Sequence, residues 1–165
     1  MPPIAANYIA YTAPVNPANA SPVLTTSQIW KALEKKVGAG QDFVGGAITA
    51  TTVLSTSTTP EGNPVTEREV TFRDGNRVVH ETCISFEPMK VEFIQPDGSK
   101  VQNVVSQGRG GEHDLYLTYT FEWLHEGATP DELAVFREKE WKVAIMAVEK
   151  TIEVIRAMVK DGKIQ

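Results

Sequence analysis

From residue 47 to residue 126, hydrophobic and polar positions alternate with the period of a β-strand. In DLYLTYTFEW, residues 114–123, leucine, leucine, tyrosine, phenylalanine and tryptophan occupy every second position. An antiparallel sheet with one buried face produces this alternation. The pattern predicts a strand with one inward face, formed by Leu115, Leu117, Tyr119, Phe121 and Trp123. Packing against a helix alone would give the same pattern as the wall of a cavity, and the residues leave both interpretations open.

Further strands are expected on either side of two strong turn signals. Asp74-Gly75 is typical of a tight hairpin, and Gly98 in Pro96-Asp97-Gly98 suits a left-handed turn position. A short first strand, rich in tyrosine, precedes a loop that begins at Pro14. The expected strands cover residues 7–13, 47–58, 65–72, 77–86, 90–95, 100–107 and 114–123.

Helical spacing replaces the alternation in two places. After the first strand, Thr25 or Thr26 can cap a helix whose apolar positions Ile29, Trp30, Leu33 and Val37 share one face and which stops at Gly38. A second short helical turn is expected over residues 41–44.

The last segment predicts a long helix. Thr129 is the expected N-cap, Pro130 the first helical residue, and Glu132 completes a capping box. Its apolar face is expected to run for roughly thirty residues, or about 45 Å, and to end at Asp161-Gly162. The face comprises Leu133, Trp141, Ala144, Ile145, Val148, Ile152, Ile155 and Val159.

This element order predicts an α+β fold in one domain, residues 1–165. A helix of that length must cross the whole sheet in so small a protein, so a sheet of about seven strands should curl round it. Two short helices should follow the first strand.

Charge and cysteine content narrow the classes of partner. The net charge is −5 and no basic stripe occurs, which argues against nucleic acid as a partner. No secretory signal and no run of roughly 18 apolar residues is seen, so no membrane partner is expected. The single cysteine, Cys83, fits a reducing compartment, and we expect a cytoplasmic protein. A homodimer is compatible with the sequence, which does not determine the oligomeric state.

The hairpin at Asp74-Gly75 carries the most informative pair of charges. A two-residue loop pairs Phe72 with Arg77 and Arg68 with Glu81, which places an ion pair on the apolar, inward face. A three-residue loop with a bulge at Gly75 would instead turn Glu81 to solvent. We favour the first register, in which the ion pair has either a structural or a catalytic role.

Two further polar residues fall at apolar positions. Arg137 lies within the apolar stripe of the long helix, where it either extends to solvent or meets an anionic group of a ligand. Asn103 should join an apolar set if Val91 pairs with it across the Pro96-Asp97-Gly98 turn. A buried asparagine needs a hydrogen-bond partner from backbone, water or ligand.

Metal and cofactor chemistry has no support in the residue pattern. His80, His113 and His125 belong to different elements and lack metal-ligand spacing. No nucleophile motif of the GxSxG type occurs. We therefore predict neither a metal nor a cofactor.

Several stretches of the chain have counterparts in a known family. They are residues 66–72, Glu81, residues 103–106, residues 115–123, residues 147–149 and residues 151–152. Through them nearly the whole chain resembles the AtaL-like family, named for a protein of a fungal acetylaranotin biosynthetic cluster, within the START-like or SRPBCC superfamily of helix-grip proteins. Birch pollen allergen proteins and polyketide aromatase/cyclases share that superfamily.

The resemblance implies a ligand cavity between the curved sheet and the long helix. It suggests a cofactor-free cyclase, isomerase or dehydratase that acts on a small hydrophobic or aromatic metabolite of fungal secondary metabolism. In that interpretation Arg68 or Arg137 stabilises an enolate-like charge and Glu81 moves a proton. A carrier with the same cavity and no chemistry is the alternative, and a regulatory or structural partner protein is a third. The expected ligand-binding residues are Trp30, Phe43, Phe72, Cys83, Phe93, Asn103, Tyr119, Phe121, Trp123, Trp141, Ala144 and Val148.

Overall fold

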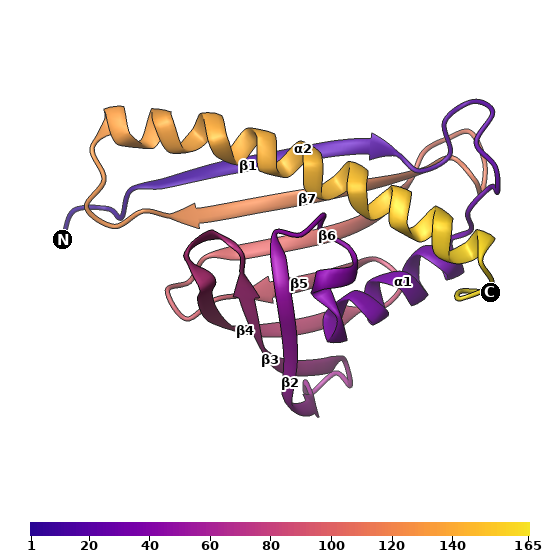
Figure 1. The fold of residues 1–165 in the computed structure, drawn as a ribbon, viewed down its shortest axis with the longest axis horizontal. Coiled ribbons are helices and arrows are strands. Elements are labelled where there is room, and N and C mark those ends of the chain that lie inside the picture. Colours follow the sequence, from indigo (N-terminus) through magenta and orange to yellow (C-terminus); the bar gives the residue numbers. More distant parts are fainter.

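A seven-stranded antiparallel sheet forms the largest part of the computed structural model, which describes residues 1–165 (Figure 1). The strands lie in the order β1-β7-β6-β5-β4-β3-β2, so the first strand pairs with the last. Their bounds are β1 Ala6–Pro14, β2 Ile48–Thr58, β3 Pro64–Phe72, β4 Arg77–Phe86, β5 Lys90–Ile94, β6 Lys100–Gln107 and β7 Leu115–Leu124.

Two α-helices accompany the sheet. Helix α1 runs from Thr26 to Gly38 and is followed by the 3-10 turn η1 (Gly40–Asp42); helix α2 runs from Pro130 to Lys160. Thr25 and Thr129 are the N-caps, and each forms a capping box with the glutamine or glutamate three residues later. Reciprocal bonds of this kind satisfy otherwise unpaired backbone donors of the first turn. No helix is both long and apolar enough to cross a membrane.

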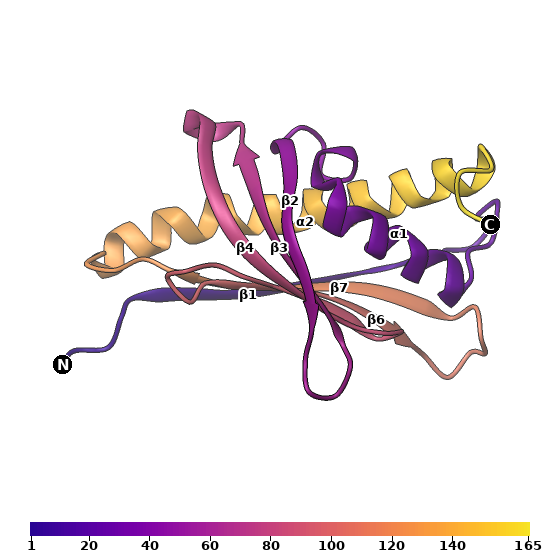
Figure 2. The same ribbon diagram turned by 90° about the horizontal axis from the view of Figure 1, so that it is seen from below.

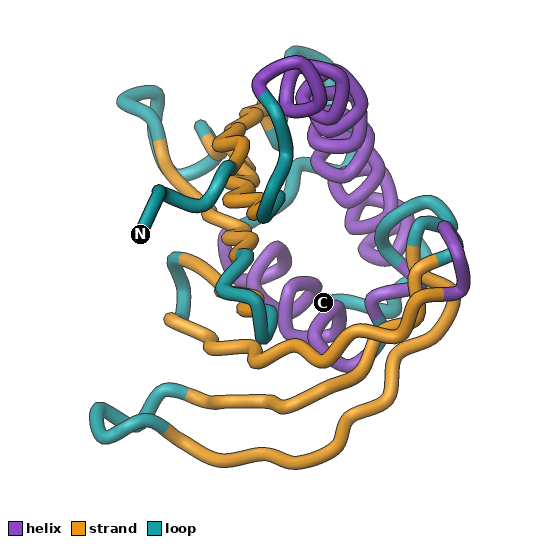
Figure 3. The backbone as a smooth tube through the Cα atoms, turned by 90° about the vertical axis from the view of Figure 1, so that its left-hand side faces the viewer, coloured by secondary structure: helices purple, strands orange, loops and turns teal.

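The sheet curves, and both helices lie on its concave side (Figure 3). Helix α2 runs along β1 and β7 (Figure 1), and α1 lies on the same side of the sheet as α2 (Figure 2). Leu117, Tyr119 and Phe121 of β7 are buried, and the intervening threonines are half-buried. The predicted α+β helix-grip architecture is therefore confirmed.

The hairpin between β3 and β4 adopts the favoured register. Phe72 lies opposite Arg77, and Arg68 lies opposite Glu81. The four connecting residues include the short 3-10 turn η2 (Asp74–Asn76), in which Gly75 has a φ of 71°. That left-handed conformation favours glycine. Glu81 consequently shares the buried face with Arg68, and the two are 5% and 2% exposed.

The long helix presents a somewhat different face to the sheet than its apolar positions suggest. Its buried residues are Glu140, Ala144, Ala147, Val148, Thr151 and Ile155. Trp141 instead lies beside the buried face, 43% exposed, with its ring edge-to-face against Tyr11 of β1 at a centroid distance of 5.8 Å. Small residues such as Ala144 and Ala147 let the helix approach the strands, and the bulky indole fits only at the margin.

Candidate functional site

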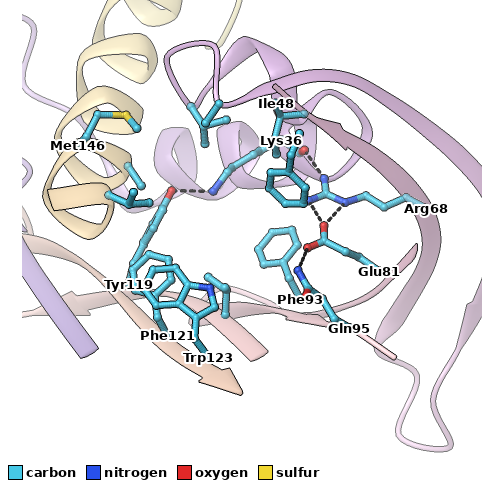
Figure 4. Close-up of a pocket in the computed structure, with 16 residues that line it drawn as sticks. Lys36, Ile48, Arg68, Glu81, Phe93, Gln95, Tyr119, Phe121, Trp123 and Met146 are labelled. Carbon is cyan, nitrogen blue, oxygen red and sulfur yellow. Dashed lines mark hydrogen bonds and ion pairs between the residues drawn. The ribbon is translucent and has the colours of Figure 1, made fainter. Parts of the chain in front are cut away.

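A pocket of about 130 Å³ lies between the concave face of the sheet, the end of α1 and the middle of α2 (Figure 4). Twelve of its sixteen lining residues are hydrophobic, so a ligand there would contact mainly apolar surface. The lining residues are Lys36, Val44, Ala47, Ile48, Arg68, Phe72, Glu81, Phe93, Gln95, Val101, Tyr119, Phe121, Trp123, Val143, Met146 and Ala147.

The Arg68–Glu81 pair forms part of the pocket wall. Nε and Nη2 of Arg68 donate to Oε1 of Glu81 at 3.1 and 2.7 Å. The second carboxylate oxygen, Oε2, accepts only a longer bond of 3.4 Å, from Gln95 Nε2 (Figure 4). Two buried opposite charges need each other, because desolvation of either one alone costs several kcal/mol. Glu81 therefore keeps one oxygen committed to Arg68 and one lightly bonded.

Arg68 also closes the C-terminal end of helix α1. Its Nη1 donates to the backbone carbonyls of Lys36 at 2.9 Å and Val37 at 2.8 Å. The last carbonyls of a helix have no partner within the helix, and a cation stabilises the negative end of the helix dipole. The guanidinium thus has a structural function that links β3 to α1 and fixes the end of the helix at the pocket.

Lys36 is the only lysine with a buried side chain, and its amine lies within the pocket wall. Nζ donates to Asn103 Oδ1 at 2.7 Å and to the Tyr119 hydroxyl at 2.9 Å. The Tyr119 hydroxyl in turn donates to Thr151 Oγ1 at 2.8 Å, which connects α1, β6, β7 and α2 through one hydrogen-bonded chain. Both partners of the amine come from strands, and the bond to Thr151 of α2 also restrains Tyr119.

Burial, together with repulsion from Arg68 and against a partial opposing effect of Glu81, lowers the pKa of Lys36 to about 7. An ammonium group loses its hydration when it is buried, and a second cation nearby adds to the cost. Burial also raises the pKa of Tyr119 above its usual value, so its hydroxyl stays protonated at neutral pH. The amine is therefore present in both its neutral and its charged form near pH 7.

Sequence reasoning did not identify Lys36 as a site residue, although a signal was present. Ile29, Leu33 and Val37 define the apolar face of α1, and position 36 lies on that face three residues after Leu33 and seven after Ile29. A lysine at such a position is either extended to solvent or buried with partners. Asn103 supplies one of those partners through its Oδ1.

The structure brings seven of the predicted site residues together at the pocket. They are Arg68, Phe72, Glu81, Phe93, Tyr119, Phe121 and Trp123. Asn103 lies directly behind Lys36, whereas its own Nδ2 has no hydrogen-bond partner.

The other predicted residues lie outside the pocket. Trp30, Phe43, Ala144 and Val148 are buried in the hydrophobic core. Cys83 is also buried, and burial raises the pKa of its thiol to about 12. Trp141 lies beside the buried face of α2 rather than on it, and Arg137 extends to solvent, which is one of its two expected positions. Arg137 is exposed and donates to the carbonyl of Tyr8 at 3.1 Å, because the first turns of α2 lie beside the start of β1.

The polar atoms of the pocket can perform two kinds of chemistry. A carboxylate oxygen and an amine can accept or donate protons. The ammonium form can also stabilise negative charge, and the neutral amine can attack an electron-poor centre. No group of three or more histidine, cysteine, aspartate or glutamate side chains is arranged to hold a metal ion.

Solved structures with this fold cover most of the chain. The Zhui aromatase/cyclase from Streptomyces sp. R1128 is 13% identical, with 94% of this chain and 96% of that chain covered and a TM-score of 0.61. A norcoclaurine synthase point mutant from Thalictrum flavum, in complex with a transition-state analogue, is 14% identical over 99% of both chains, with a TM-score of 0.60.

The di-domain aromatase/cyclase BexL of the BE-7585A biosynthetic pathway is also similar, at 9% identity and a TM-score of 0.61. The alignment covers 92% of this chain but 49% of BexL, so the chain spans about half the length of that protein. Identities this low establish the fold and nothing more.

No curated protein sequence matches the chain. A family model does, over residues 9–162, and it is described as acetylaranotin biosynthesis cluster protein L. Since the match includes almost every element from β1 to the end of α2, the chain belongs to the AtaL family.

Proposed function

We propose that this protein binds a small aromatic or hydrophobic metabolite in the pocket and catalyses a cofactor-free proton transfer on it, as a cyclase, isomerase or dehydratase of natural-product metabolism. The observation that carries the proposal is the pairing of an apolar pocket with two separate polar groups, the Lys36 amine and Glu81 Oε2. The names of the family and of two structural neighbours agree with biosynthetic chemistry.

The size of the pocket restricts the ligand. Its volume of about 130 Å³ is close to the roughly 150 Å³ of an apolar protein cavity that accommodates benzene. Phe93 and Phe121 supply ring faces, and Met146, which is 37% exposed, lies where the pocket meets the surface. One aromatic ring therefore fits inside, while larger substituents would have to extend past Met146.

The polar groups suggest how the reaction would proceed. The ammonium form of Lys36 has a third N–H beyond the two that Asn103 and Tyr119 accept, and it would stabilise negative charge on a ligand oxygen. Glu81 Oε2 would take a proton from the carbon next to the one that bears that oxygen. Arg68 would hold Glu81 in position, as its bonds to α1 already restrain it.

A carrier without chemistry is the second candidate, and one observation favours it. Glu81 Oε1 accepts two bonds from Arg68, and Arg68 Nη1 donates to two backbone carbonyls of α1. A charge pair with these bonds can serve the fold alone. In that case the pocket would bind its ligand without converting it to a product.

Ligand binding is tested by NMR titration with phenol. Phenol should shift the methyl resonances of Ile48, Val101 and Ala147 in a saturable manner. The variant Ala147→Phe fills the pocket and should abolish these shifts, whereas the control Ala157→Phe, at an exposed position of the same helix, should leave them unchanged. Equal binding by the two variants would overturn the proposed site.

Catalysis is tested with acetophenone in deuterated water. An enzyme of the proposed class should exchange the hydrogens of the methyl group beside the carbonyl faster than buffer does, and Glu81→Gln should abolish the excess rate. If acetophenone binds without accelerated exchange, the carrier interpretation is correct. If Glu81→Gln exchanges as fast as the unmodified protein, the assignment of Glu81 is wrong.

A further inference from the structure

The hydrogen bonds around Lys36 match a neutral amine. A neutral amine has two N–H groups and one lone pair, and the two acceptors Asn103 Oδ1 and Tyr119 Oη take both N–H groups. None of the ion pairs in the structure includes Lys36, so no carboxylate partner retains the charge. The contacts that would offset a buried ammonium are the rings of Phe93 and Tyr119, whose centroids lie 5.3 and 4.3 Å from Nζ, and its third N–H would have no hydrogen-bond acceptor among the protein atoms.

The hydrogen bonds that continue beyond Tyr119 determine which group donates between Tyr119 and Lys36. The Tyr119 hydroxyl gives its own proton to Thr151 Oγ1, which lies within 3.5 Å of the Phe43 carbonyl oxygen and donates to it. Tyr119 must therefore accept from Lys36. Around the tetrahedral nitrogen, Cε, Asn103 and Tyr119 occupy three directions, no hydrogen bond uses the fourth, and Lys36 is among the residues that line the pocket.

We propose that Lys36 is a nucleophile that forms an imine with an aldehyde or ketone group on a single-ring aromatic substrate. This inference rests on the proposed function and names its substrate class. The lone pair of Nζ attacks the carbonyl carbon, a C–N bond forms, and the carbonyl oxygen receives a proton to give a carbinolamine. The C–O bond then breaks, and the oxygen leaves as water with the two hydrogens of the amine, which gives a neutral imine. A proton taken up from solvent then gives the protonated imine.

The position of Glu81 fits the step that follows. A protonated imine withdraws electrons more strongly than a carbonyl does, which makes the adjacent C–H bond more acidic. Oε2 of Glu81, held by Gln95 alone, is the carboxylate oxygen of the pocket that is free to remove that proton. Lys36 would therefore activate the substrate and Glu81 would transfer the proton.

The low pKa of Lys36 would make this lysine react in preference to the other lysines at neutral pH. With a pKa of about 7, about half of its amine is neutral at pH 7. An ordinary lysine, with a pKa of 10.5, is neutral in only about one molecule in three thousand at that pH. Lys35 is adjacent in sequence but exposed, and it provides a matched comparison.

The test uses benzaldehyde and sodium cyanoborohydride, which reduces an imine to a stable benzylamine. At pH 7 the intact mass should increase by one benzyl group, and peptide mapping should place it on Lys36. Lys36→Met should abolish the adduct and Lys35→Met should retain it. Since a variant can misfold, the rate of benzyl labelling should also be measured in the unmodified protein as a function of pH. This rate should be half-maximal near pH 7, and phenol should reduce it by competing with benzaldehyde for the pocket.

Two failures can be told apart. If phenol produces no saturable shifts, the proposed function itself fails. If phenol binds but benzaldehyde gives no adduct, or labels Lys36 no faster than the exposed lysines, binding stands and the nucleophile proposal is overturned.

Discussion

Replacing Lys36 with methionine should change how the stability of the protein depends on pH. The folded pKa of Lys36 is about 7, and its ordinary value is 10.5. Between these two values the unfolded chain binds more protons than the folded chain, so this lysine makes stability rise with pH. Below about pH 7 both states are protonated, and burial of the charge then costs the fold on the order of 5 kcal/mol. The cost decreases as pH rises from 7 and vanishes above 10.5.

The size of the effect can be worked out for an accessible range. Between pH 7.5 and pH 9, the unmodified protein should gain about 2 kcal/mol relative to Lys36→Met. The variant leaves Asn103 Oδ1 and Tyr119 Oη without their donor at every pH, so that loss is constant and cancels from the slope. Ionisation of tyrosines and of Cys83 occurs in both proteins and also cancels.

Urea unfolding at several pH values measures this difference, with Lys35→Met as the control. Lys35 is exposed, so its substitution should give the same pH dependence as the unmodified protein. If the free energies of unfolding of the unmodified protein and Lys36→Met instead differ by a constant amount from pH 7.5 to pH 9, the Lys36 amine is charged throughout. The reasoning from burial would then be refuted.

Three other substitutions test the contacts around the site and its helix. Arg68→Met should lower the free energy of unfolding by about 3–5 kcal/mol, because it leaves the Glu81 carboxylate buried without a cation. Adding Glu81→Leu should recover much of that loss. If urea denaturation finds the double variant no more stable than Arg68→Met, this reasoning is wrong. Tyr119→Phe removes an acceptor of Lys36 and should lower the free energy of unfolding by about 1–3 kcal/mol. A urea denaturation midpoint equal to that of the unmodified protein would contradict the buried chain of hydrogen bonds. Thr129→Ala removes the N-cap of α2 and should lower stability by about 1 kcal/mol at an unchanged m-value, and an unaffected thermal midpoint would count against the capping box.

Local patterns were sufficient to predict the strands and their register. Alternation identifies the inward face of β7, and the Asp74-Gly75 turn offers only two registers for β3 and β4. The inward positions of Val70 and Cys83 favour the observed one. The position of Glu81 on the pocket wall follows from that register, because successive side chains in a strand point to opposite faces.

The long helix illustrates where pattern alone is insufficient. Apolar residues occur on more than one side of α2, and the choice among them depends on how closely the helix approaches β1 and β7. Ala147 and Thr151 allow that approach, whereas Trp141 does not fit between the layers. Which residues touch across two elements is decided by their packing, and this also explains the exposed position of Arg137.

Lys36 was missed for a related reason. A charged residue on the apolar face of a short helix has two ordinary explanations, and its partners come from β6 and β7, more than sixty residues away. No spacing within α1 connects it to Asn103 or Tyr119. The juxtaposition depends on the curvature of the whole sheet.

The most direct test of the account is a crystal structure of the protein soaked with 4-bromophenol, in which the anomalous signal of bromine locates the ring. The account predicts the ring between Phe93 and Phe121, with its hydroxyl within hydrogen-bonding distance of Lys36 Nζ. A pocket without the ligand, together with bromine bound elsewhere on the surface, would contradict it.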